Sequence, residues 1–170
     1  MFTQFGHGGW RFNLLGFPVR VDLTFWLLAI VTGLGLEDPW AIAIWVAVFF
    51  VSILAHELGH ALMGRAFGFH SDIQLYSMGG LTSFYSGGLA HWQDVLVSLA
   101  GPCTGLAIGG CVHAAILQWG WPEEYYPRLI LYVLRSVNAV WALLNLLPIL
   151  PLDGGQITES VIHWVRGYRN

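Results

Sequence analysis

The chain has 170 residues, 56% of them hydrophobic and only 10% charged, whereas a soluble domain usually carries about 25% charged residues. A soluble domain of this size is mostly surface and could not bury so much apolar side chain, so the composition predicts an integral membrane protein. The net charge of −3 and the absence of lysine provide no basic patch, and nucleic acid is not an expected partner. The length predicts one domain, residues 1–170.

The N-terminal segment, residues 1–22, has a strand-like pattern. Apolar residues alternate with other residues on either side of Gly16, at Phe12, Leu14, Phe17, Val19 and Val21. A period of two on both sides of a glycine predicts a β-hairpin.

Four apolar stretches follow and predict a core of about four transmembrane helices over residues 23–152. The stretches are Leu23 to Leu36, Pro39 to Ala66, Val95 to Trp121, and Leu129 to Leu152. A helix needs about 20 apolar residues to cross the bilayer. The first stretch is shorter, so it can span only with help from Phe17 to Val21 or where the bilayer is thinned. Residues 156–170 are too short and too polar to cross and predict an interfacial tail helix.

Residues from about 70 to 88, between the second and third stretches, predict a second hairpin. Ile73 and Leu75 precede Gly79-Gly80, and Leu81 to Tyr85 follow. A pair of glycines suits the tight turns of hairpins. An irregular loop at the membrane interface is the alternative.

The arginines predict the orientation, because the cytoplasmic flanks of membrane helices collect positive charge. If four helices alternate across the membrane, five arginines fall on one side, and the acidic residues of two loops fall on the other with Arg128. Both termini are then expected in the cytoplasm, at the plasma (inner) membrane. The fold class is an all-α polytopic membrane protein with a small β-hairpin or sheet element at the cytoplasmic side. The five arginines are Arg11, Arg20, Arg65, Arg166 and Arg169.

Two histidines in the second stretch, His56 and His60, give the clearest chemical signal. Residues four apart lie on one face of a helix, so both imidazoles can reach one metal ion. Glu57 lies beside them, where it can take a proton from an attacking water. Ionisable residues within a membrane helix are costly to insert and therefore indicate a functional site. A satisfied polar cluster between helices is the alternative, but it would not need this spacing.

Asp153 is the candidate third ligand. Irregular backbone at membrane depth is tolerated only where protein or a watery cavity covers it, and a carboxylate placed there favours a ligand. Catalytic zinc usually has three protein ligands and one open position. The sequence therefore predicts one Zn²⁺ per chain, held by His56, His60 and Asp153. The alternative is that Asp153 caps a helix starting at Gln156. Asp153 is surrounded by Pro148, Pro151, Gly154 and Gly155.

Together these motifs resemble the site-2 protease family of intramembrane zinc metalloproteases. The resemblance implies hydrolysis of a peptide bond within a transmembrane segment of a membrane-protein substrate, inside the lipid bilayer. It also implies that Asn145 lies near the active site with Glu57, and that the hairpin holds the substrate as an added strand. The motifs are His56 to His60 (HELGH), Gly79-Gly80, Ala100-Gly101-Pro102, Asn145 to Pro148 (NLLP) and Leu152 to Gly155 (LDGG).

Two other functions fit parts of the sequence. A catalytically silent, zinc-bearing membrane scaffold would bind transmembrane helices without cutting them, but the intact Glu57 argues against it. A transporter or channel would use a polar path along Arg135, Asn138 and Asn145, and the lack of an internal repeat argues against that. Asn138 is expected to form a hydrogen bond between helices, whereas the sequence gives Arg135 no obvious partner.

Overall fold

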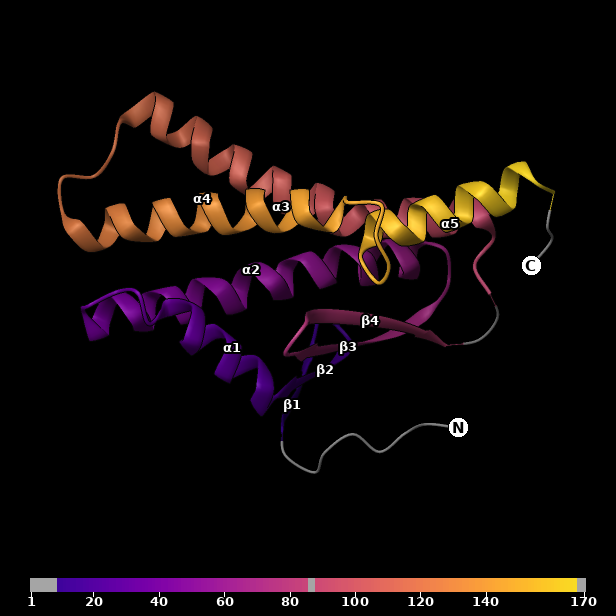
Figure 1. Ribbon diagram of the computed structural model, residues 1–170, viewed down its shortest axis with the longest axis horizontal. Coiled ribbons are helices and arrows are strands. Elements are labelled where there is room, and N and C mark those ends of the chain that lie inside the picture. The colour runs from indigo at the N-terminus through magenta and orange to yellow at the C-terminus, as the bar shows by residue number, and fades with distance from the viewer. Residues whose placement is uncertain (1–8, 86–87, 168–170) are drawn as a thin grey trace.

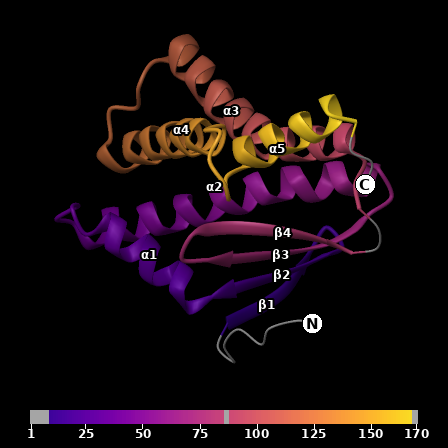
Figure 2. The same cartoon turned by 45° about the vertical axis from the view of Figure 1, so that its right-hand side comes forward.

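A small sheet packs along one side of a layer of long helices (Figures 1 and 2). The computed structural model describes residues 9–85 and 88–167, so the first eight residues of the predicted N-terminal segment, and Arg169, lie outside the described residues. The elements within these ranges are β1 (Gly9–Leu14), β2 (Phe17–Asp22), α1 (Leu23–Gly33), α2 (Pro39–Ala66), β3 (His70–Tyr76), β4 (Gly79–Tyr85), α3 (His91–Trp119), α4 (Tyr125–Asn145) and α5 (Asp153–Val165).

The predicted N-terminal hairpin is confirmed. Strands β1 and β2 pair antiparallel from Gly9 opposite Asp22 to Leu14 opposite Phe17. The two residues between them, Leu15 and Gly16, have φ values of 53° and 87°. Positive φ at both central positions is what a type I′ hairpin turn requires.

The second hairpin is also confirmed, which contradicts the irregular-loop alternative, but its turn is not where the sequence placed it. Tyr76 pairs with Gly79, so the turn consists of Ser77 and Met78, and both glycines belong to β4. The glycines are required by close packing instead. A Cβ at Gly79 would lie 2.3 Å from Trp141 Cζ2, and one at Gly80 would lie 2.3 Å from Glu57 Oε1.

The two hairpins join into one sheet, which the sequence did not predict. Strand β2 pairs with β3 in parallel, with Val19 opposite Ile73 and Val21 opposite Leu75, which gives the order β1-β2-β3-β4. The side chains of these four residues are at most 2% exposed. They belong to a core that α1 and α2 cover with Phe25, Phe49 and Ile53, among other residues. This core holds the sheet against α2.

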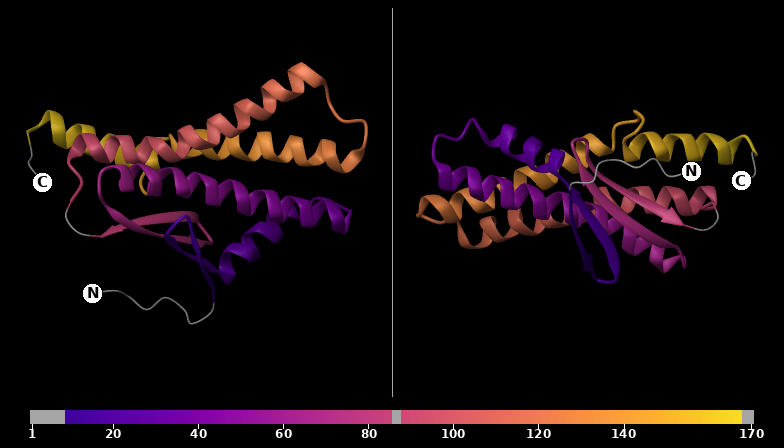
Figure 3. Two further views of the ribbon diagram at one scale, coloured as in Figure 1. Left: turned by 180° about the vertical axis from the view of Figure 1, so that it is seen from behind. Right: turned by 90° about the horizontal axis from the view of Figure 1, so that it is seen from below.

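Three of the four predicted apolar stretches form helices long and apolar enough to cross a membrane: α2, α3 and α4, with 28, 29 and 21 residues. The first stretch forms only the 11-residue helix α1. Helix α4 ends at Asn145, and the loop that follows leads into α5. Helix α5 begins three residues before the predicted start at Gln156, so Asp153 is its first residue. Helices α3 and α4 separate toward the loop that joins them (Figure 3).

Asn138 and Arg135 of α4 each contact a polar side chain of another helix. Asn138 is 2% exposed and donates from Nδ2 to Ser52 Oγ of α2 at 2.8 Å, which confirms the predicted hydrogen bond between helices. Arg135 lies about one turn earlier on α4. One of its Nη atoms is 3.3 Å from His113 Nδ1, and its guanidinium is 5.6 Å from the centre of the Trp121 ring.

Candidate active site

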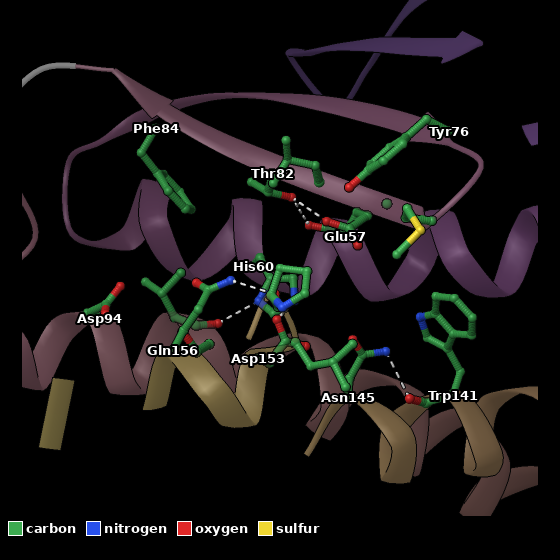
Figure 4. A pocket seen from close by; sticks show the side chains of 17 residues that line it. Glu57, His60, Tyr76, Thr82, Phe84, Asp94, Trp141, Asn145, Asp153 and Gln156 are labelled. Atoms are coloured by element: carbon green, nitrogen blue, oxygen red, sulfur yellow. Dashed lines mark hydrogen bonds and ion pairs between the residues drawn. The ribbon is translucent and has the colours of Figure 1, made fainter. Parts of the chain in front are cut away.

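The two histidines of α2 meet Asp153 at the start of α5. His56 Nε2 lies 3.1 Å from Asp153 Oδ2 and 3.2 Å from His60 Nε2, and His60 Nε2 lies 3.4 Å from Asp153 Oδ1. One donor atom from each residue falls within 4.8 Å of the others, so a single metal ion could contact all three. The three residues are at most 9% exposed, so this polar cluster is largely shielded from solvent. Figure 4 shows how His60 and Asp153 lie.

The surroundings of the cluster fit a metal ion. His60 Nδ1 donates to the carbonyl oxygen of Val97 at 2.7 Å, which leaves the lone pair of Nε2 directed at the cluster, as in metal-binding histidines. His56 Nδ1 is buried and has no hydrogen-bond partner among the described residues. A Cβ at Gly101 would lie 2.2 Å from His60 Nε2 and 2.8 Å from His56 Nε2, so this glycine keeps space open for both imidazoles. Two imidazoles and one carboxylate are a donor set typical of catalytic zinc.

Asp153 does not cap α5, so that alternative is wrong. The N-cap residue is Leu152, and the Asp153 carboxylate points to the histidines instead.

Gly154, the residue after Asp153, allows α5 to start close to the preceding loop. A Cβ at Gly154 would lie 2.2 Å from the carbonyl oxygen of Leu146, so α5 packs directly on the loop after α4. Farther along α5, Ser160 donates a hydrogen bond to Asp94 of α3. Helix α5 is therefore attached at its start to the preceding loop and farther along to α3.

Glu57 is 5% exposed and lies beside the cluster. Its Oε2 accepts a hydrogen bond of 2.8 Å from Thr82 Oγ1 of β4 (Figure 4). Sequence reasoning missed Thr82, because a threonine in a strand is ordinary. The only signal was its position on the strand face that also carries Gly80 and Phe84.

A cavity of about 210 Å³ opens onto Glu57, His60 and Asp153. Asn145 lines it, as the resemblance implied for a residue near the site, and its Nδ2 donates to the carbonyl oxygen of Trp141 at 2.9 Å. The walls come from the hairpin, α3, α4 and the start of α5, and include Tyr76, Met78, Gly80, Leu81, Thr82, Phe84, Asp94, Val97, Ser98, Trp141, Pro151, Leu152 and Gln156. The arrangement places a potential base, a set of metal donors and a hollow with both polar and apolar walls together.

Comparisons with known proteins find similar sequences. The family model of peptidase family M50 matches residues 124–170. A protein of Synechocystis sp. named as a zinc metalloprotease is 33% identical over 159 residues, 93% of this chain and 38% of that protein. A zinc metalloprotease of Methanocaldococcus jannaschii is 28% identical over 162 residues, 92% of this chain and 46% of that protein. The chain thus spans less than half the length of these curated relatives.

The fold of the chain is also similar to that of a solved structure. The site-2 protease from Methanocaldococcus jannaschii superposes with a TM-score of 0.74 and 26% sequence identity, covering 94% of this chain and 74% of that one. The three long apolar helices suit a membrane protein of this kind. In both sequence and fold, the chain is similar to the site-2 protease family, peptidase family M50.

Proposed function

We propose that this chain is an intramembrane zinc metalloprotease that hydrolyses a peptide bond within a transmembrane segment of a membrane-protein substrate. The observation that carries the proposal is the convergence of His56, His60 and Asp153 beside Glu57. This cluster lies between helices that are long and apolar enough to cross a membrane. Four polar residues buried together at such a place are costly unless they bind an ion or do chemistry.

His56, His60 and Asp153 would hold one zinc ion per chain. When bound, zinc lowers the pKa of a water molecule and polarises the scissile carbonyl group. Glu57 accepts the proton of the attacking water and later delivers it to the leaving amine. The carbonyl oxygen of Val97 holds the His60 ring, because Nδ1 donates to it at 2.7 Å.

Asn145 would contact the substrate backbone in the cavity. It is the last residue of α4, and its side-chain amide lies in the cavity wall together with Glu57 and Asp153. An amide can donate to a carbonyl oxygen and accept from an N–H group of an extended peptide. This role orients the substrate and is separate from the proton transfer assigned to Glu57.

The substrate would bind as an extended strand beside β4. A transmembrane helix must unwind before one of its peptide bonds becomes accessible, and pairing with a strand edge keeps the unwound segment extended. Strand β4 is at one edge of the described sheet. Gly80, Leu81 and Thr82 of this strand line the cavity.

The protein would cross the membrane about four times, with α1 as the short fourth element and both termini in the cytoplasm of the plasma (inner) membrane. The α1–α2 and α3–α4 loops lie at one end of the long helices, and the β1–β2 hairpin and α5 lie toward the other (Figure 1). The first end carries Glu37, Asp38, Glu123 and Glu124 with one arginine, Arg128, and the second carries Arg11, Arg20, Arg65 and Arg166. This separation supports a cytoplasmic location for the sheet.

Removing the metal tests the proposal. The protein is reconstituted into liposomes with a single-span reporter protein, and cleavage is followed by gel electrophoresis. We expect 1,10-phenanthroline to stop cleavage and added Zn²⁺ to restore it. A reporter that co-purifies with the protein but stays intact would favour the silent scaffold, and cleavage that persists in the chelator would contradict a metalloprotease.

A further inference from the structure

One face of β4 packs along the helix that carries Glu57. Alternate residues of a strand share a face, and on this face Gly80, Thr82 and Phe84 each meet α2. Gly80 lies against the Glu57 side chain, and Thr82 is hydrogen-bonded to Glu57. Phe84 packs on Gly64 of α2, where a Cβ would lie 2.1 Å from Phe84 Cε1. The strand therefore follows α2 from Glu57 to Gly64. Figure 4 shows Thr82 between the strand and the helix.

The Thr82 hydroxyl holds Glu57 at two points. Thr82 Oγ1 lies 2.8 Å from Oε2 and 3.2 Å from the backbone carbonyl oxygen of Glu57. An ionised carboxylate and a carbonyl oxygen only accept hydrogen bonds, so the hydroxyl is the donor and shares its single hydrogen. The other carboxylate oxygen, Oε1, lies over Gly80, where a Cβ would be 2.3 Å away.

Few orientations remain open to a side chain held in this way. Glu57 is 5% exposed, and a buried carboxylate is stable only where protein groups replace the hydrogen bonds of water. Glycine at position 80 provides the space for the carboxylate, and Thr82 provides the hydrogen bond. Both come from the same strand, so the orientation of Glu57 depends on β4 being seated on α2.

We propose that Thr82 is a positioning residue, whose hydroxyl holds the Glu57 carboxylate in the orientation that accepts the proton of the attacking water. The inference rests on the proposed function of Glu57 as the base. It also links the hairpin to the chemistry, because displacing β4 removes the hydrogen bond that orients the base.

The variant Thr82→Val tests the inference, since valine keeps the shape of threonine and lacks the hydroxyl. Kinetics are measured in liposomes with the single-span reporter, next to zinc content and the midpoint of thermal unfolding. We expect kcat to fall about 10- to 100-fold, the effect of losing one hydrogen bond to a charged group. KM, zinc content and the unfolding midpoint should stay close to those of the wild type, and Thr82→Ser should recover most of kcat.

The control is Thr24→Val, which makes the same chemical change at an exposed position of α1, away from β4 and the cavity, and should leave kcat unchanged. Unchanged kcat in Thr82→Val, failure of Thr82→Ser to recover it, or a lower unfolding midpoint with lost zinc in Thr82→Val would each overturn the inference. Glu57→Gln is measured in parallel. If that variant cleaves at the wild-type rate, the proposed role of Glu57 is wrong. If Glu57→Gln lowers the cleavage rate and Thr82→Val does not, only the positioning role of Thr82 is wrong.

Discussion

Replacing Glu57 by glutamine is expected to abolish cleavage and to leave zinc in place. Glutamine has nearly the same shape, and its side-chain carbonyl oxygen can still accept the hydrogen bond that Thr82 donates to Oε2. An amide cannot take the proton of the attacking water, and the loss of a positioned base lowers rates about 10²- to 10⁴-fold. The initial rate of reporter cleavage and the zinc content of the same preparation are the two measurements.

The matched control for this variant is Glu159→Gln, which makes the same chemical change at an exposed position of α5. It should retain both activity and zinc. Cleavage by Glu57→Gln at the control rate would show that Glu57 is not the base. Loss of zinc in Glu57→Gln, with zinc retained in the control, would show that Glu57 is a metal ligand rather than the base that accepts the proton.

Substituting Gly101 by alanine is expected to empty the metal site without touching a ligand. The new Cβ would lie 2.2 Å from His60 Nε2 and 2.8 Å from His56 Nε2, closer than real Cβ atoms approach other atoms. The imidazoles or α3 must move, and misplacing ligands through a supporting residue typically costs about 10- to 100-fold in metal affinity. Zinc content after dialysis against a weak chelator measures the effect.

Gly110→Ala provides the comparison, because Gly110 is in the same helix and a Cβ there would meet nothing within 4 Å. Alanine is a better helix former than glycine by about 1 kcal/mol, so this variant should fold at least as well as the wild type and keep its zinc. Equal zinc in the two alanine variants would contradict the placement of Gly101 against the histidines.

The centre of the site could be predicted because its geometry is local. Residues four apart share a helix face wherever the helix lies, so His56 and His60 had to point together once α2 formed. Asp153 required chemical reasoning about a third ligand, and the structure brings its carboxylate within 3.1 Å of His56 Nε2. The ligand roles themselves, and the roles of Glu57 and Asn145, stay predictions until metal binding and cleavage are measured.

The sheet could be predicted only in part, because its central pairing is not local. Each hairpin has a short-range signal, but the parallel pairing of Val19 with Ile73 joins residues far apart in the sequence. Gly79 and Gly80 were assigned to a turn because turns favour glycine. Close packing against Trp141 and Glu57 also favours glycine. The sequence alone does not distinguish a glycine required by a turn from one required by close packing, whereas the fold does.

Metal content is the measurement that tests the central claim most directly. Protein purified in detergent without chelators is analysed by inductively coupled plasma mass spectrometry, together with His56→Ala and Asp153→Ala. We expect about one zinc per chain in the wild type, since three ligands fix a single site, and a clear loss in both variants. Absence of zinc from the wild type, or zinc that neither substitution lowers, would contradict the assignment of His56, His60 and Asp153 as a catalytic metal site.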